Sequence, residues 1–312
     1  LVDAETKDLL RSSVRELFDS QGGDIAAGLE EFGWDDVVAE DPAAAVDLLF
    51  GEQGAAGRSS SALDSVAFLG QANGAVNGRL IIHPIAGLSA ATRVGEHLLV
   101  GGVILGLPDG AALVGLDDAG YEISGDVVQS AASPVSGFDP SSRLHRVRTT
   151  IPADTATRVE IDWSAVTAVI CRALASELVG NGRAMLHIAA EQITGRMQFG
   201  RPIGANQTPR HRLAECYALL SGADELAQAA WRSATPWDAR VAKTYAGYAA
   251  HATSRACMQV CGAIGLTTEH RLPTYVKRGR ILDGLYGGWE QWVHELGARL
   301  LDTAAIPAAA RI

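Results

Sequence analysis

The chain has 312 residues, of which 47% are hydrophobic and 20% charged, and these proportions predict a folded protein with a large core. Its formal net charge of −10 argues against nucleic acid as a partner, because binding to phosphates requires a positive surface. Short apolar runs, a start (LVDAETKDLLR) unlike a signal peptide and only four cysteines argue against a membrane span, secretion and a disulfide framework, so we expect a cytoplasmic protein.

Residues 1–84 are predicted to form a helical domain. The first helix is expected to begin at an Asp3 cap and to end at Gly22–Gly23, with further helices over 43–50 and 61–71. Four apolar residues of the first helix recur on one helical face: Leu10, Val14, Leu17 and Phe18.

Residues 85–155 have a different pattern, in which short apolar runs alternate with turn residues. Pro108–Gly110 and Asp117–Gly120 are turn sequences, because proline fixes φ and glycine accepts positive φ. The pattern predicts a small antiparallel β domain. The expected strands contain residues 98–100, 103–105, 112–116 and 127–128.

Residues 156–312 are predicted to form a four-helix bundle. Prolines fall only between the long helical stretches, where they do not interrupt backbone hydrogen bonds. The four expected helices cover residues 165–197, 213–233, 238–260 and 284–301. The fold class is therefore α+β and mostly α.

One motif at the end of the first bundle helix combines a cation, an aromatic ring and a glycine. It reads Arg196-Met-Gln-Phe-Gly-Arg-Pro-Ile203, followed by Gln207 and by Leu213-Ala-Glu215. A guanidinium there offers a forked donor for pyrophosphate oxygens, and the ring offers a flat apolar surface. The motif resembles the Arg-x-Gln-Phe-Gly-x-Pro-Ile…Gln…Leu-Ala-Asp signature of the acyl-CoA dehydrogenases. Read alone, it is equally compatible with a helix end and a solvated arginine.

A second motif lies at the end of the penultimate long helix. It reads Gln259-Val-Cys-Gly262-Ala263-Ile-Gly265 and resembles the family's Gln-x-x-Gly-Gly-x-Gly, with alanine in place of the second glycine. Glycines let a ligand approach the main chain, and an amide side chain both donates and accepts hydrogen bonds. A glycine helix cap is the alternative reading.

A third, shorter motif runs from Asp139 to Val147. It is similar to the Asp-Pro-Ser/Thr-Arg-Arg-Leu-Ala-x-Val of family members that act on sterol-derived CoA esters. The three motifs cover the C-terminal half of the chain well and the first 130 residues poorly.

The resemblance implies an FAD enzyme of the CH–CH oxidoreductase class, in which each chain lends these two C-terminal motifs to the flavin of its neighbour. The residues implied to contact cofactor are Arg196, Gln198, Phe199, Gln207, Gln259, Gly262, Ala263 and Gln291. Of these, Gln291 matches a position that contacts the cofactor of its own chain.

The family's catalytic base is missing from both of its known positions. The glutamate of the family's Tyr-Glu-Gly-Thr sequence corresponds to Gly287, and the alternative base position on the penultimate helix corresponds to Tyr248. A free phenol has a pKa of about 10 and is a poor base at neutral pH. Trp289 replaces the family's threonine, and we expect it to fill part of the flavin site.

The middle segment also lacks the family's Thr-Glu-Pro…Gly-Ser-Asp and Trp-x-Thr/Ser sequences, which surround the flavin ring. By resemblance, the chain is the short subunit of an α2β2 actinobacterial dehydrogenase, and lends half of an FAD site to a full-length partner. The acyl-CoA would bind at the partner's site, and an electron-transfer flavoprotein would reoxidise the cofactor.

Three alternatives remain open from the sequence. The first is a self-sufficient homo-oligomeric acyl-CoA dehydrogenase with a displaced base, for which Glu290 and Asp283 are the nearby candidates. The second is a non-enzymatic helical scaffold with relic FAD motifs. The third is a di-iron bundle, which the spacing disfavours because the His/Glu pairs are four residues apart, whereas such sites need Glu-x-x-His. We therefore expect no metal site.

Overall fold

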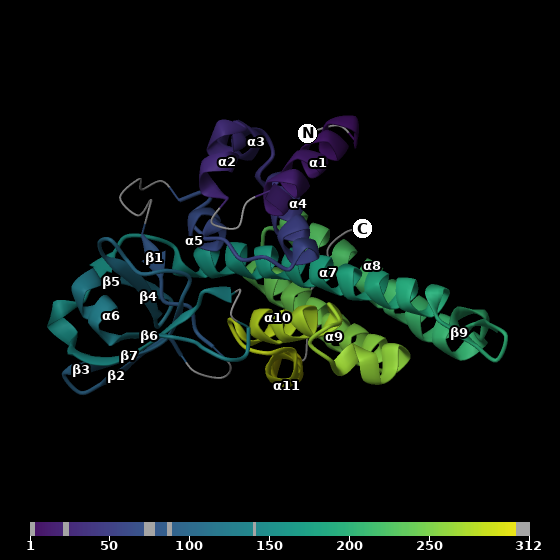
Figure 1. The fold of residues 1–312 in the computed structure, drawn as a ribbon. Helices are drawn as coiled ribbons and strands as arrows, with labels where there is room; N and C mark the ends of the chain where they lie inside the picture. The colour runs from purple at the N-terminus through teal and green to yellow at the C-terminus, as the bar shows by residue number, and fades with distance from the viewer. Residues whose placement is uncertain (1–3, 21–24, 72–78, 86–88, 140–141, 304–312) are drawn as a thin grey trace.

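The computed structural model describes residues 4–20, 25–71, 79–85, 89–139 and 142–303. Figure 1 shows three parts along the chain: N-terminal helices, two small β-sheets and long C-terminal helices. The predicted α+β, mostly α architecture is confirmed. The sheets lie at one end of the long helices, and strand β9 (Met197–Gln198) lies at the other end.

The N-terminal part is helical, as predicted. Its helices are α1 (Ala4–Ser20), α2 (Ala26–Glu31), α3 (Trp34–Glu40), α4 (Pro42–Ala56) and α5 (Ala62–Val66). Val14 and Phe18 of α1 are fully buried, in keeping with the one-face spacing. The expected start at Asp3 and stop at Gly22–Gly23 lie outside the described residues. Helix α4 is longer than expected because its Asp41 cap accepts a hydrogen bond from the Ala44 N–H and because Gly57 ends it in a left-handed conformation.

The β part consists of two four-stranded sheets. The first has the order β1 (Leu80–Ile81), β4 (Ala112–Leu116), β5 (Ala119–Ile123) and β8 (Thr157–Val159). The second has the order β2 (Ala91–Val94), β3 (His97–Ile104), β7 (His145–Pro152) and β6 (Ala132–Pro134). Pairing is antiparallel except between β1 and β4.

One expected strand is wrong. Val127 and Val128 lie in a helix, α6 (Gly125–Ala131), and Val128 is fully buried. Two adjacent apolar residues mark the buried side of a helical turn as well as they mark a strand, so the spacing alone did not decide between them.

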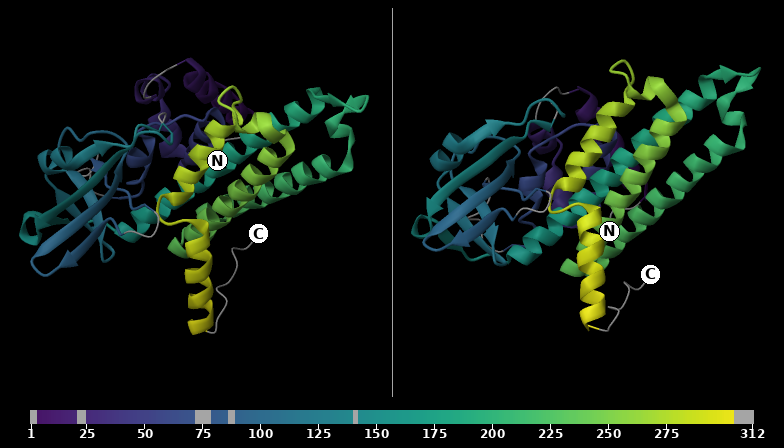
Figure 2. Two further views of the ribbon diagram at one scale, coloured as in Figure 1. Left: turned by 60° about the horizontal axis from the view of Figure 1, so that its bottom comes forward. Right: turned by 90° about the horizontal axis from the view of Figure 1, so that it is seen from below.

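Four long helices form the bundle, but the fourth is not the expected one. They are α7 (Trp163–Gly195), α8 (Gln207–Ser233), α9 (Pro236–Cys261) and α10 (Leu272–Gly284). The expected last helix is α11 (Trp289–Thr303), which packs mainly against α9 and projects from the body in Figure 2. It has no buried residue, whereas α10 buries Leu272, Tyr275 and Leu282 against the bundle.

Helix α7 is the core of the molecule. It is the one helix within the described residues that is long and apolar enough to cross a membrane, which the expectation of only short apolar runs had missed. Its most apolar window has a mean hydropathy of 1.3, and 83% of that window is buried inside the protein. The apolar surface of α7 is therefore used against the neighbouring helices.

Candidate functional site

The first motif forms a tight hairpin at the far end of the bundle. Arg196 ends α7, and strands β9 and β10 (Arg201–Pro202) pair around Phe199 and Gly200. The two turn residues have φ of 53° and 77°, a left-handed geometry that glycine accepts freely and phenylalanine adopts at a cost. Nevertheless, Phe199 is 99% exposed. A strained, fully exposed aromatic ring is typical of a side chain presented to a partner or a ligand.

The second motif forms the turn between α9 and α10. Helix α9 ends at Cys261, and Gly262 has a φ of 69° at the start of the 3-10 helix η5 (Gly262–Leu266). A Cβ built on Gly262 would meet nothing within 4 Å, so the main chain is open to a ligand there. Gln259 and Ala263 are exposed beside it.

The two motifs flank one apolar cluster at the same end of the bundle. This cluster joins the ends of α7 and α9 to the starts of α8 and α10 through Ile193, Leu213, Cys257, Cys261 and Leu272. Burial raises the pKa of both cysteine thiols. The polar residues expected to contact cofactor at this end are all exposed: Arg196, Gln198, Gln207 and Gln259. Exposed apolar side chains accompany them, namely Met197, Ile264 and Leu266.

Gln291 lies far from this end, in a cavity of about 480 Å³ near the sheets. The turn Asp117–Asp118 between β4 and β5, the first turns of α7 and the start of α11 line the cavity. The Gln291 amide donates to the Glu295 carboxylate at 2.7 Å. Figures 1 and 2 show the junction of sheets and bundle at one end and the β9 hairpin at the other. The residues expected to contact cofactor are therefore divided between two separate places in one chain.

Trp292 occupies the space beside Gly287, the residue that the sequence resemblance pairs with the family's base. Gly287 has a φ of 89°, and a Cβ there would lie 2.3 Å from Trp292 Nε1. The indole N–H donates to the Tyr286 carbonyl at 2.7 Å, and the Arg240 guanidinium stacks 3.7 Å above the ring. A glutamate at 287 therefore does not fit unless Trp292 moves. Trp292 lines the cavity, and Trp289, which we expected to fill part of a flavin site, is not among the lining residues.

A buried lysine, which the sequence reasoning missed, holds the same loop. The Lys243 side chain is fully buried on α9, and its ammonium donates to the carbonyl oxygens of Asp283 and Gly287. Burial lowers the pKa of Lys243 to about 8, against the opposing attraction of Asp283. No spacing rule marks one lysine among the apolar residues of a helix, so no local pattern could have indicated this role.

The candidate replacements for the base lie elsewhere. Asp283 accepts a hydrogen bond from the Trp289 N–H at 3.0 Å and does not line the cavity, while burial raises its pKa. Glu290 is exposed at the start of α11. Tyr248 is 39% exposed and packs its ring 5.3 Å from that of Trp289. None of these three side chains lines the cavity.

Two further sequence observations have a structural counterpart. In the third motif, the buried Ser142 donates to the Asp139 carbonyl at 2.7 Å, and residues 140–141 lie outside the described residues. Of the His/Glu pairs, His187 and Glu191 lie 3.1 Å apart on the exposed face of α7. Across the described part of the chain, no three His, Cys, Asp or Glu side chains gather as a metal site.

Comparison with known proteins identifies the family of the helical bundle. Residues 172–300 match the family described as "Acyl-CoA dehydrogenase, C-terminal domain". The acyl-CoA dehydrogenase IpdE2 of Mycobacterium tuberculosis is 28% identical over 304 residues, which cover 88% of this chain and 91% of that protein. The helical bundle belongs to the acyl-CoA dehydrogenase family. Acyl-CoA dehydrogenase FadE34 of the same organism is 30% identical over 232 residues, 72% of this chain and 31% of FadE34.

Three solved structures share the fold over nearly the whole chain. The Tcur3481-Tcur3483 steroid ACAD has a TM-score of 0.73 at 18% identity, covering 97% of this chain and 99% of that one. The ChsE4-ChsE5 complex from Mycobacterium tuberculosis has a TM-score of 0.71 at 18% identity, covering 98% and 99%. A glutaryl-CoA dehydrogenase of Mycobacterium smegmatis in complex with FADH2 has a TM-score of 0.68 at 15% identity, covering 98% and 97%.

Proposed function

We propose that this acyl-CoA dehydrogenase chain is the non-catalytic subunit of a heteromeric, FAD-dependent enzyme that dehydrogenates an acyl-CoA between its α and β carbons. One observation carries the proposal. The motifs that the family lends to a neighbour are exposed and open, whereas the position of the base is occupied by Trp292. A chain with this combination can complete a partner's site without having a working one of its own.

The lent half has the donor chemistry that FAD requires. Arg196 would neutralise pyrophosphate charge with its forked donors, and Gln198 and Phe199 would position the adenosine half. Gln259 would hydrogen-bond a phosphate or ribose, and Gly262, with open space at its Cβ position, would allow close main-chain approach. The side chains are exposed at the end of the bundle, as a site completed by another chain requires.

The catalytic groups would come from the partner. FAD, when bound, supplies the redox chemistry of the reaction. A partner glutamate would remove the α-proton of the thioester, because neither Asp283 nor Glu290, the two carboxylates expected as displaced bases, lines the cavity. Electrons would then pass to an electron-transfer flavoprotein.

Sterol-derived CoA esters are the substrate class that we propose, for a complex working in the cytoplasm. The third motif suggests this class, and one fold relative is titled a steroid ACAD. Another is titled as a complex of two different chains, which supports an α2β2 assembly with a full-length acyl-CoA dehydrogenase.

Co-expression with a full-length acyl-CoA dehydrogenase from the same genome tests the proposal. We expect a stable complex with one FAD per two chains, measured from flavin absorbance and native mass. Arg196→Ala should remove most of the FAD from that complex because the pyrophosphate loses its charged donor. Arg158→Ala, a change of an exposed arginine on β8, should leave the FAD content unchanged.

The opposite result is equally well defined. If the chain purified alone binds one FAD per chain and oxidises an acyl-CoA, it is a self-sufficient homo-oligomeric enzyme. If neither the chain nor the complex holds flavin, the motifs are relics on a helical scaffold.

A further inference from the structure

A second large cleft lies between the N-terminal helices and the bundle, and no residue of the two flavin motifs lines it. Its volume is about 710 Å³, within the range of small-molecule sites. Helices α1 and α4 form one wall, and α7, α8 and the start of α10 form the other. Four arginines line it: Arg11, Arg15, Arg183 and Arg271.

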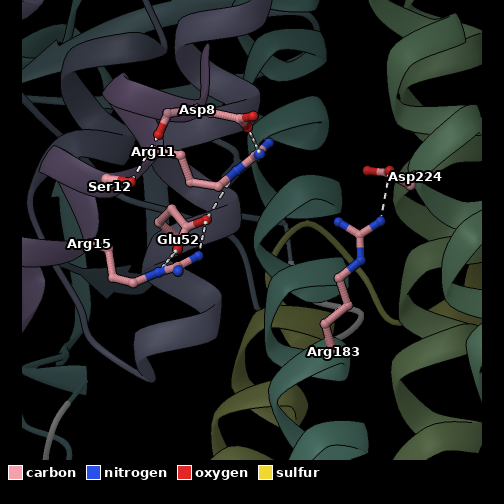
Figure 3. Close-up of polar contacts among 7 residues, drawn as sticks. All are labelled: Asp8, Arg11, Ser12, Arg15, Glu52, Arg183 and Asp224. Atoms are coloured by element: carbon pink, nitrogen blue, oxygen red, sulfur yellow. Dashed lines mark hydrogen bonds and ion pairs between the residues drawn. The ribbon is translucent and has the colours of Figure 1, made fainter. Parts of the chain in front are cut away.

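Carboxylates hold the two arginines of the first wall in place. Figure 3 shows Arg11 and Arg15 reaching from α1 toward Glu52 on α4. The Arg15 Nε and Nη2 donate to the two Glu52 oxygens at 3.0 and 3.2 Å, and the Arg11 Nη1 donates to Asp8 at 3.0 Å. Glu52 itself is only 8% exposed, so its carboxylate lies on the buried side of these guanidinium groups.

The opposite wall carries the other two cations. The Arg183 Nη2 donates to the Asp224 carboxylate on α8 at 2.8 Å. In Figure 3, this pair lies opposite Arg11 and Arg15. Arg271 is exposed and forms no ion pair within the described residues. Because a guanidinium has five N–H donors, these ion pairs leave most donors of both walls available to a ligand.

The cleft has a positive balance in a chain that is acidic as a whole. Three carboxylates line it, those of Asp47, Glu52 and Asp224, against four guanidinium groups. Asp47 is engaged by the Ser176 hydroxyl, which donates to it at 2.6 Å, and burial raises the pKa of Asp47. Each lining acid therefore already accepts a hydrogen bond from the protein.

The floor between the two walls is apolar. It is formed by Leu48, Val179, Ile188 and the ring of Tyr275, all of them largely buried. The Tyr275 hydroxyl donates to the Ala55 carbonyl at 3.0 Å, which turns its polar atom away from solvent. An anion with an apolar body would match both parts of the cleft.

We propose that this cleft binds an organic phosphate, with the phosphate held between the arginines of the two walls and the apolar part resting on the floor. Planar guanidinium groups suit a phosphate better than lysines do, because they bind it through paired donors. The site is independent of the proposed role in FAD binding, since neither flavin motif lines the cleft.

Calorimetric titration of the full chain with octyl phosphate tests the proposal. We expect saturable binding of one ligand per chain. Arg183→Gln should weaken it about tenfold, because one charge-assisted contact is lost while the side chain keeps most of its length. Arg232→Gln, a matched change of an exposed arginine on α8 outside the cleft, should leave the affinity unchanged.

Two further ligands separate the parts of the proposal. Inorganic phosphate should bind more weakly than octyl phosphate, and octyltrimethylammonium should not compete. Equal affinity for inorganic phosphate would overturn the role of the floor, and equal binding by Arg183→Gln would overturn the site. Arg196→Ala should bind octyl phosphate normally even if it loses FAD in the complex, so the two proposals can fail separately.

Discussion

Two residues decide what can stand at the position of the family's base. Gly287 supplies a backbone with a φ of 89°, and Trp292 places its indole where a side chain at 287 would start. The indole is fixed on one side by the Tyr286 carbonyl and on the other by Arg240. The backbone geometry at Gly287 and the packing of Trp292 together therefore exclude a larger side chain at position 287 in this loop conformation.

Restoring the carboxylate alone should consequently damage the protein. We expect Gly287→Glu to lower the free energy of unfolding by about 3 kcal/mol, from the positive φ and from displacement of Trp292, and to create no dehydrogenase activity. Urea denaturation with an acyl-CoA assay measures both effects. Gly95→Glu is the control, because Gly95 also has a positive φ but open space around it, and it should cost only about 1 kcal/mol. If the two variants lost equal free energy of unfolding, displacement of Trp292 would not contribute to the cost at position 287.

Lys243 makes the same loop sensitive to pH. Its pKa in the folded chain is about 8, below the 10.5 of a free lysine. The unfolded chain therefore binds this proton more tightly than the folded chain does. Below pH 8 the folded state bears the full cost of a buried charge, and this cost disappears as the pH rises toward 10.5.

The variant Lys243→Met should lack that dependence. We expect the unfolding free energy of the native chain to rise relative to that of the variant between pH 8 and pH 10, by at most about 3 kcal/mol. Urea titrations of both proteins at several pH values give the difference directly, and other titrating groups cancel. A difference that is constant with pH would contradict a lowered pKa for Lys243.

Among the elements, α4 and α7 approach each other very closely. A Cβ on Gly180 would lie 2.0 Å from the Gly51 carbonyl oxygen, and one on Gly54 would lie 2.1 Å from the Glu177 carbonyl oxygen. Glycines on both helices thus allow their backbones to touch. This contact joins the N-terminal helices to the bundle.

Substitution of a glycine in this contact should be far more costly than elsewhere in the same helix. Gly180→Ala should destabilise the chain by about 3 kcal/mol, because the new methyl group would meet backbone atoms of Gly51, which cannot rotate away as a side chain can. Gly195→Ala, also in α7 but with nothing within 4 Å, should be neutral or stabilising by up to about 1 kcal/mol. Thermal unfolding of the two variants compares them, and similar stabilities would show that α4 and α7 can move apart freely.

Predictability from the sequence also differs by element. The stripe of α1 and the long proline-free stretch of α7 were predicted because periodicity and proline placement are local properties. The strand at Val127–Val128 was wrong, and α11 was expected in the bundle, because two apolar residues do not fix a period and helical propensity does not say which helix packs where. Tertiary contacts decide both.

At the scale of the whole molecule, the motifs indicated which residues would contact a cofactor. They did not indicate how these residues are arranged in space. The Arg196 and Gln259 motifs were found because glycine and aromatic residues at fixed spacing are visible in a sequence. Trp292 and Lys243 both contact Gly287 but come from different helices, and no local pattern in the sequence connects them. The cleft with Arg15 and Arg183 was missed for the same reason.

The same arrangement shows which surface a partner would cover. The β9 hairpin lies at the opposite end of the bundle from the sheets, and its Phe199 is 99% exposed beside Met197, which is 55% exposed (Figure 1). Removing these side chains from water would favour association, and aromatic residues contribute strongly to the centres of interfaces. Inside the isolated chain, Phe199 contributes almost no buried surface.

Phe199→Ser should therefore separate association from folding. We expect the unfolding free energy of the chain alone to change by less than about 0.5 kcal/mol, while the complex with a full-length acyl-CoA dehydrogenase weakens at least about tenfold in Kd. Val94→Ser removes a side chain that is 55% exposed on β2, at the other end of the molecule, and should affect neither quantity. Chemical denaturation and native mass titration measure the two effects. Normal assembly of Phe199→Ser would place the partner on a different surface.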